Sequence, residues 1–395
     1  MSSITPSPSA PKVTPLGAES ALRRAILYLL YLGAATLAVL LFLELSLRLF
    51  FGLPEGLFHY EPFDKGTLFL PDTEMRMVMG PMPYTIKTNR HGLRGPDIPL
   101  EKPAGTTRII ALGDSVTHGF YVPNEHTYPE LLEQNLRRDG YTVDVINIAR
   151  GFASIDMEFA MLKKYGMKLA PDIVVLTFVT NDIEEIAGKS REQLLHHDLD
   201  HPLPEAQSEW FLFGRTAVGE LLLDSMMKWR YPKYRKHARE LGATDDPEIT
   251  IEDGDHFRRN AEHFLNDFAK KYNSFAWYES FSPEQQAVVD DYLWALEQLK
   301  LYCDEQGLVL VFSYHPDYAH LYLPERKQPL YDQLKAACAR LGIPFADQVP
   351  VFRAHADEVL HFAPVDYHPN AAGNALIAEA VQDTLLSKGL LRHDE

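Results

Sequence analysis

The chain has 395 residues, of which 24% are charged and 46% are hydrophobic. This composition suits one large or two modest globular domains with a sizeable core and excludes an intrinsically disordered protein. The formal net charge of −17 argues against nucleic acid as a partner, because binding to phosphates needs a basic surface. An acidic exported protein fits better.

The N-terminal region predicts a membrane anchor. Residues 1–21 are rich in Ser, Pro and Ala and predict a disordered cytoplasmic lead-in. The stretch 25–43 contains no charged residue, and about nineteen residues at 1.5 Å each approach the thickness of a bilayer core. We therefore expect a transmembrane helix that contacts the lipid bilayer through 25–43, inside an anchor that spans 22–51.

The charges around this helix predict its orientation. Arg23 and Arg24 precede it, whereas its near C-terminal flank offers only Arg48, so the positive-inside rule places the N-terminus in the cytoplasm. A cleaved signal peptide is the alternative. No small-residue cleavage pattern follows the apolar run, which favours an uncleaved signal anchor.

The rest of the chain has the pattern of an α/β fold. Residues 52–107 are rich in Gly and Pro and predict an extended stalk that packs on the domain. From Arg108, short β-rich runs alternate with helical segments, which predicts a parallel sheet. The expected strands lie at 108–113, 143–148, 172–179, 308–313 and 343–347, and the expected helices lie near 128–139, 154–168, 283–306, 328–341 and 371–387.

This alternation predicts a flavodoxin-like three-layer α/β sandwich with a five-stranded parallel sheet, formed by 108–187 and 282–390. Residues 188–281 interrupt it and are too long for an ordinary connection, so they predict an insertion with its own structure. Aromatic and basic residues follow one another at 210–236. A helix packed on the core is the favoured reading, and a lid or membrane-facing helix is the alternative. Cys303 and Cys338 fall in predicted helices and indicate core packing rather than a disulfide.

Two polar motifs carry the expected chemistry. Ser115 follows the first predicted strand, so it emerges at the carboxyl end of the sheet, where open α/β sheets bind ligands. A serine hydroxyl needs an imidazole to accept its proton and a carboxylate to orient that imidazole. Asp366 and His368 follow the last strand, so we expect Ser115, Asp366 and His368 to form a catalytic triad. The backbone N–H groups of Ser115 and Gly151 and the side-chain amide of Asn181 are candidate oxyanion donors.

Four blocks of the sequence resemble the SGNH/GDSL hydrolase family, in the order of that family. They are GDSV with Ser115, NIARG with Gly151, VTND with Asn181, and DYHPNAAG with Asp366 and His368. The stretch before the first block, from 88 onward, also resembles membrane-anchored bacterial members. The resemblance covers roughly 85–187 and 283–388.

Two positions depart from the family pattern. Val179 stands where the family often has glycine, which would reshape the oxyanion pocket. The family's aspartate commonly precedes its histidine by three positions, whereas Asp366 precedes His368 by two. A backbone carbonyl or another carboxylate such as Asp357 is therefore an alternative partner for the imidazole.

Other polar residues near strand ends are candidates for lining the pocket, namely His118, Asp182 and His315. The run of histidines and aspartates at 196–201 favours a solvated loop over a zinc site, because no second cluster of ligands accompanies it. Neither a metal nor an organic cofactor is implied.

The leading hypothesis is a serine ester hydrolase that acts on O-acyl or O-acetyl groups of a carbohydrate or lipid. One alternative is an O-acyltransferase that modifies an exported polysaccharide through the same acyl-enzyme. Another is a non-catalytic subunit of a membrane complex that keeps the fold. The resemblance and the anchor imply a bacterial cytoplasmic membrane, with the catalytic domain on the periplasmic side.

Overall fold

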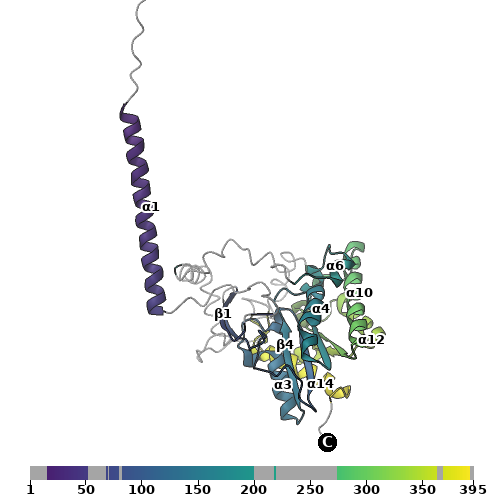
Figure 1. Ribbon diagram of the computed structural model, residues 1–395. Coiled ribbons are helices and arrows are strands. Elements are labelled where there is room, and N and C mark those ends of the chain that lie inside the picture. Colours follow the sequence, from purple (N-terminus) through teal and green to yellow (C-terminus); the bar gives the residue numbers. More distant parts are fainter. Residues whose placement is uncertain are drawn as a thin grey trace, which may run out of the picture.

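The computed structural model describes residues 16–51, 68–69, 71–79, 82–199, 218, 274–362 and 368–391 (Figure 1). Three expectations fall mainly or wholly outside these residues. They are the disordered lead-in at 1–21, most of the insertion at 188–281, and Asp366.

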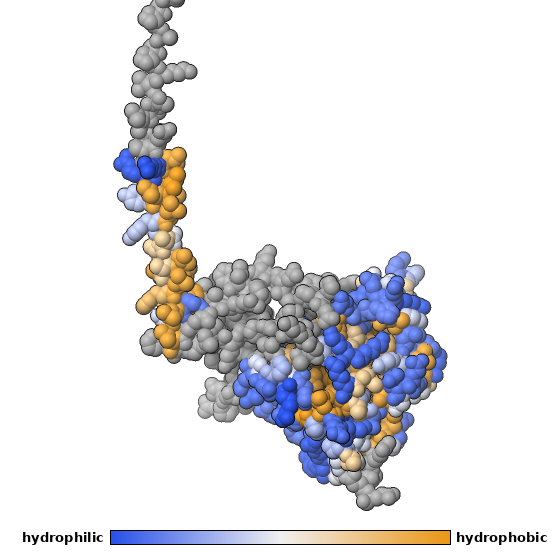
Figure 2. All heavy atoms as spheres, viewed as in Figure 1, coloured by the Kyte–Doolittle hydropathy of each residue, from blue (hydrophilic) through white to orange (hydrophobic). Residues whose placement is uncertain are grey.

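The N-terminal helix α1 (Leu16–Phe51) stands apart from the α/β domain in Figure 1. Its segment Ala21–Leu47 has a mean hydropathy of 2.4, and none of its most apolar window is buried by the rest of the protein. On the face shown in Figure 2, hydrophobic side chains coat most of α1, whereas the described surface of the domain is largely hydrophilic. The predicted apolar helix is therefore present, and it is long and apolar enough to cross a bilayer.

A parallel sheet of five strands forms the centre of the domain, as predicted. Its spatial order is β4-β3-β5-β6-β7, and every neighbouring pair is parallel. The strands are β3 (Thr107–Gly113), β4 (Val143–Ala149), β5 (Ile173–Phe178), β6 (Val309–Tyr314) and β7 (Phe345–Asp347). Gly113 pairs with Ala149 on one side and Thr177 on the other, so β3, β4 and β5 end at the same edge.

Helices cover both faces of the sheet, which confirms the three-layer sandwich. In β3, Ile110 and Leu112 join the core on one face, whereas Ile109 and Ala111 join the core on the other. The first face packs against α4 (Ile155–Lys164), α10 (Pro283–Glu305) and α12 (Pro329–Leu341). The second packs against α3 (Tyr128–Arg138), α13 (Val349–Ala354) and α14 (Ala371–Ser387).

The helix boundaries follow local capping chemistry. Ser282 and Gln285 form the capping box that begins α10, and Gly342 ends α12 in the left-handed conformation. The shorter elements are α2 (Ser115–His118), α5 (Asn181–Glu185), α6 (Arg191–Leu195), α11 (Tyr318–Tyr322) and the 3₁₀ turns η1 (Asn124–His126), η2 (Gly166–Leu169) and η5 (Phe275–Trp277). Cys303 and Cys338 are buried and unpaired, as expected for core packing.

The segment before β3 contains a hairpin that the sequence pattern did not predict. Strands β1 (Glu74–Met79) and β2 (Met82–Lys87) pair in antiparallel register. Residues around this hairpin are buried in the same core as the sheet, among them Leu68, Phe69, Tyr84, Ile86 and Leu93. The lead-in is therefore continuous with the domain core.

Candidate active site

Ser115 begins the short helix α2 directly after β3. The turn is tight at Gly113, where a Cβ atom would collide with the side chain of Thr117 and lie 3.1 Å from the carbonyl oxygen of Thr177. Asp114 caps the helix, because its Oδ1 accepts the N–H of Val116 at 2.9 Å. A residue without a side chain at position 113 thus allows the chain to turn and present Ser115 at the edge of the sheet.

His368 lies against Ser115 although the two residues are 253 positions apart, and its Nε2 is 2.7 Å from Ser115 Oγ. The chain around His368 is fixed on both sides. Its carbonyl accepts the N–H of Phe362 at 3.1 Å, and Asn370 caps α14 by accepting the N–H of Gly373 at 3.0 Å. The structure thus brings together the predicted serine and histidine within hydrogen-bonding distance.

Asp114 provides a second partner for the serine hydroxyl. Its Oδ2 lies 3.0 Å from Ser115 Oγ and 3.3 Å from Asn181 Nδ2. Ser115 has a single hydroxyl proton, which it can donate either to Asp114 or to a neutral His368. In the first case Ser115 accepts a hydrogen bond from the imidazole, and in the second it is poised to lose its proton to that imidazole.

The three candidate oxyanion donors follow the ends of three adjacent strands. Ser115 follows β3, Gly151 follows β4, and Asn181 begins α5 after β5. The N–H of Arg150 donates to the carbonyl of Gly113 at 3.3 Å, which draws the turn after β4 toward the serine. The Asn181 amide donates to Glu185 Oε1 at 3.3 Å as well as to Asp114.

The structure does not describe the carboxylate that was expected beside His368. Asp366 lies outside the described residues. Asp357, the alternative carboxylate, is exposed in the segment after α13. An exposed carboxylate orients an imidazole weakly because water competes for it. Asp366 therefore remains the predicted partner, with a backbone carbonyl as the alternative.

The three residues considered for the pocket are all buried. His118 packs between Phe69 and Phe120, with ring centroids 5.4 Å and 5.5 Å away. Asp182 accepts the backbone N–H of Val179 at 3.1 Å. His315 Nδ1 lies 2.8 Å from Gln348 Oε1. All three side chains are therefore part of the protein interior near the ends of the strands.

The buried histidines are neutral near pH 7. Burial lowers the pKa of His315 to about 4, and it lowers the pKa values of His118 and His361 well below their usual range. Each of these rings lies close enough to His368 for an electrostatic interaction with a charge on it. Because they are neutral, they add no positive charge that would oppose protonation of His368.

Glu158 is a buried carboxyl group near Asp114. Among the described residues, neither of its oxygens has a hydrogen-bond partner. Burial raises its pKa well above the usual range, and the negative charges of Asp114, Asp156 and Glu185 raise it further. Burial also raises the pKa of Asp182, and the nearby Glu158 carboxyl group raises it further. We therefore expect Glu158 to be protonated in the folded protein at neutral pH.

The substitution Glu158→Gln tests whether the buried Glu158 carboxyl group is protonated in the folded protein. The raised folded pKa means that the native state keeps a proton that the unfolded state loses above about pH 4.5. The contribution of Glu158 to stability is thus complete below pH 4.5 and falls as the pH rises toward the folded pKa. Relative to wild type, Glu158→Gln should gain stability by about 1.4 kcal/mol per pH unit over that range. Urea unfolding at pH 5 and at pH 7 measures the difference, and an equal effect at both values would refute it.

Several residues around the site were not singled out by the sequence pattern. Phe120 and Tyr121 contact the His368 ring, with centroids 4.9 Å and 5.5 Å away. Asp114 belongs to the Gly-Asp-Ser motif, so the sequence indicated its position beside Ser115. No sequence pattern indicated the aromatic contacts, because they depend on the loop after α2 folding back onto a residue near the C-terminus.

A comparison with known proteins finds a relative that matches only a short region of the chain. An uncharacterised protein of Mycoplasma pneumoniae is 29% identical over 129 residues, which are 31% of this chain and 15% of that protein. The chain therefore spans only a small part of that relative's length.

Solved structures of similar proteins include a lipase/acylhydrolase from Enterococcus faecalis, with 15% identity, a TM-score of 0.38, and coverage of 73% of this chain and 99% of that one. They also include an acetylxylan esterase from Geobacillus stearothermophilus, with 13% identity, a TM-score of 0.37, and coverage of 71% and 94%.

The sequence profile of one family gives a far more extensive match than the relative does. The profile is described as the GDSL-like lipase/acylhydrolase family, and it matches residues 111–376. The matched range contains Ser115, Gly151, Asn181 and His368, which agrees with the resemblance of the four blocks. Because the match covers well over half of the sequence, this chain belongs to the GDSL-like lipase/acylhydrolase family.

Proposed function

We propose that the protein is a serine ester hydrolase in which Ser115 is the nucleophile and His368 is the general base. The distance of 2.7 Å between Ser115 Oγ and His368 Nε2 is the observation that carries this proposal. Such a contact allows the imidazole to remove the hydroxyl proton as the oxygen attacks. The position of Ser115 at the carboxyl end of the central strand also supports it.

In the proposed reaction, Ser115 Oγ attacks the acyl carbonyl and its proton passes to His368 Nε2. The tetrahedral intermediate collapses when the leaving alcohol takes that proton, which leaves an acyl-enzyme. Water then attacks the acyl-enzyme by the same steps and releases the acid. Asp366 is proposed to orient the imidazole.

The backbone N–H groups of Ser115 and Gly151 and the Asn181 amide are proposed to stabilise the oxyanion. The Asn181 amide donates to Asp114 and Glu185 at 3.3 Å in the structure without substrate. An oxyanion would compete with these carboxylates for the amide. Charge-assisted hydrogen bonds are short, so we expect the amide to shift toward the oxyanion as the intermediate forms.

The proposed substrate is an O-acyl or O-acetyl group on a carbohydrate or lipid outside the cytoplasm. The apolar helix is long enough to cross a bilayer. Residues 25–43 are proposed to anchor the chain in a bacterial cytoplasmic membrane, with a cytoplasmic N-terminus and a periplasmic domain, and this placement would suit that substrate class. Near the C-terminal end of the apolar span Ala21–Leu47, Glu44 Oε2 accepts the N–H of Val218 at 3.0 Å. This contact joins α1 to Val218 in the insertion.

The test uses the full-length protein in detergent. We expect turnover of p-nitrophenyl acetate and covalent labelling by a fluorophosphonate, with mass spectrometry locating the label on Ser115. A series of longer acyl esters would show whether the enzyme prefers acetyl groups or lipid-like chains. A folded protein that neither turns over esters nor reacts with the probe would contradict the proposal and favour a non-catalytic role.

A further inference from the structure

Arg94, from the segment between β2 and β3, reaches the loop that follows the nucleophile helix. The side chain is almost completely buried. Its Nη1 donates to the carbonyl oxygens of His118 at 2.6 Å and Gly119 at 2.7 Å, and its Nη2 donates to that of Val122 at 2.5 Å. A single guanidinium group therefore holds three backbone carbonyls of this loop, and its planar set of donors suits that task.

The loop itself adopts a conformation that needs support. Gly119 has φ +85°, and Tyr121 has φ +64°, which is costly for a residue with a side chain. The carbonyl of Thr117 is also held, by Asn147 Nδ2 at 2.8 Å. Side-chain donors from outside the loop thus fix its path from the end of α2 onward.

The same loop supports both members of the proposed catalytic pair. Ser115 begins α2, and its carbonyl accepts the N–H groups of Gly119 at 2.9 Å and Phe120 at 3.1 Å. Phe120 and Tyr121 in turn pack against the ring of His368. A displacement of the loop would therefore change the positions of both Ser115 and the His368 ring.

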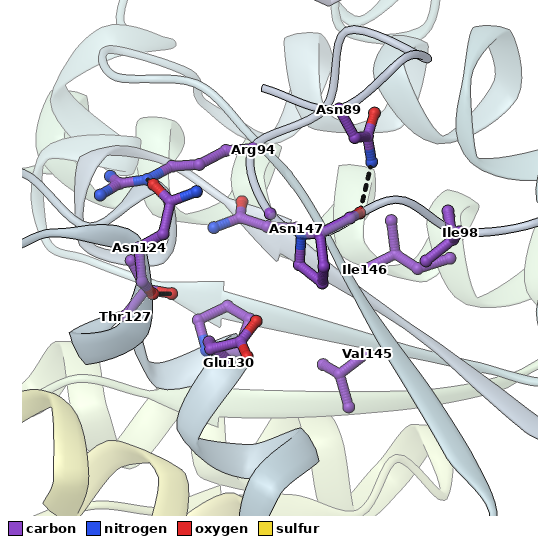
Figure 3. Close-up of a pocket in the computed structure, with 12 residues that line it drawn as sticks. Asn89, Arg94, Ile98, Asn124, Thr127, Glu130, Val145, Ile146 and Asn147 are labelled. Carbon is purple, nitrogen blue, oxygen red and sulfur yellow. Dashed lines mark hydrogen bonds between the residues drawn. The ribbon is translucent and has the colours of Figure 1, made fainter. Parts of the chain in front are cut away.

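Arg94 belongs to the lead-in at 52–107, and Asn124 links it to Lys87 at the end of β2. Its Nε donates to Asn124 Oδ1 at 2.9 Å, and Asn124 also bonds to the backbone N–H of Lys87 at 3.2 Å and its carbonyl at 2.7 Å. In Figure 3 the side chains of Arg94 and Asn124 point toward one another at the wall of a small pocket, which Asn147 also lines. The Arg94 guanidinium also lies 5.9 Å from the Tyr84 ring. The lead-in that joins the domain to α1 is thus bonded to the active-site loop.

We propose that Arg94 is a positioning residue that sets the geometry of Ser115 and His368 by holding the loop at residues 118–122. This inference rests on the proposed hydrolase function. The arginine acts through the loop and does not touch the reacting atoms. Through Arg94, the lead-in would contribute to the geometry of the active site.

Arg108 offers a matched control at the opposite end of the sheet. It is also fully buried, and it donates to Asp144 Oδ2 and to the carbonyls of Pro99, Leu100 and Leu169 at 2.7 to 3.2 Å. It therefore resembles Arg94 in burial and bonding but lies at the start of β3, away from Ser115. Substituting either arginine should cost stability, whereas only Arg94 should affect catalysis.

The experiment compares full-length wild type, Arg94→Lys, Arg94→Ala and Arg108→Lys in detergent. For Arg94→Lys we expect kcat for p-nitrophenyl acetate to fall about tenfold to a hundredfold with KM within about twofold, because small displacements of reacting groups slow chemistry more than binding. For Arg108→Lys we expect a lower unfolding temperature with kcat within about twofold of wild type. Millimolar guanidinium should partly restore kcat in Arg94→Ala.

Hydrogen exchange gives a second readout that does not depend on activity. Amides of residues 117–122 should exchange faster in Arg94→Lys than in wild type and should be unchanged in Arg108→Lys. Wild-type kcat and exchange in Arg94→Lys would overturn the proposal, as would losses of kcat that follow stability equally in both lysine variants. If wild type is inert toward esters and the probe, the proposed function fails, while the exchange comparison still decides whether Arg94 holds the loop. If Arg94→Ala does not fold, the lysine variants decide.

Discussion

Ser115→Ala is expected to abolish fluorophosphonate labelling and to lower kcat/KM for acyl esters by at least about a thousandfold. In the proposed mechanism Ser115 supplies the oxygen that forms the acyl-enzyme, and alanine offers no replacement. The backbone N–H groups proposed as oxyanion donors remain in this variant, so a small residual rate above that in water is expected. Rates of p-nitrophenyl acetate hydrolysis and gel fluorescence after labelling measure both effects.

Ser190→Ala is the matched control for this substitution. Ser190 is exposed and caps α6 by accepting the N–H of Gln193 at 3.3 Å, so its loss should cost some stability and leave labelling intact. Retention of labelling and turnover in Ser115→Ala, with the fold preserved, would show that another residue is the nucleophile.

His368→Ala is expected to reduce kcat by about three to six powers of ten, because the hydroxyl of Ser115 then has no general base. The Nε2 to Oγ distance of 2.7 Å is the reason to expect so large an effect. Asp114 also contacts the hydroxyl at 3.0 Å, but a carboxylate accepts a proton far less readily than an imidazole near neutral pH. Stopped assays over long incubation are needed to measure the residual rate.

The double variant sharpens this prediction. If Ser115 and His368 act as one unit, then Ser115→Ala with His368→Ala should be no slower than the slower single variant. His126→Ala serves as the control, because His126 is exposed at the end of η1. Losses that multiply in the double variant would mean that the two side chains contribute separately, and the proposed proton transfer between them would then be wrong.

Two buried acids, Glu158 and Asp182, lie close enough to Asp114 for its negative charge to raise their pKa values. Burial raises the pKa values of Glu158 and Asp182 well above their usual range, which favours their protonated forms. In that form they add little negative charge near the position where an oxyanion would develop. The pH dependence expected for Glu158→Gln is the direct check on this feature.

Local sequence patterns were enough to predict the strands, the principal helices and the order of the motifs. The limits of α10 follow from Ser282, Pro283 and Gln285 at its start, which are neighbours along the chain and act on the local backbone. The five strands were visible because each is a short apolar run between helical segments. The family was likewise visible in the four blocks, and the profile match over residues 111–376 confirms it.

The contacts between residues far apart in the chain could be identified only in the folded protein. The approach of His368 to Ser115 was expected from strand order, but its distance was not. The β1-β2 hairpin, the reach of Arg94 into the loop after α2, and the burial of Glu158 had no pattern in the sequence, because each depends on contacts between segments far apart in the chain. Periodicity and capping report the local environment of a residue, whereas the chemistry of this site depends on where separate elements pack together.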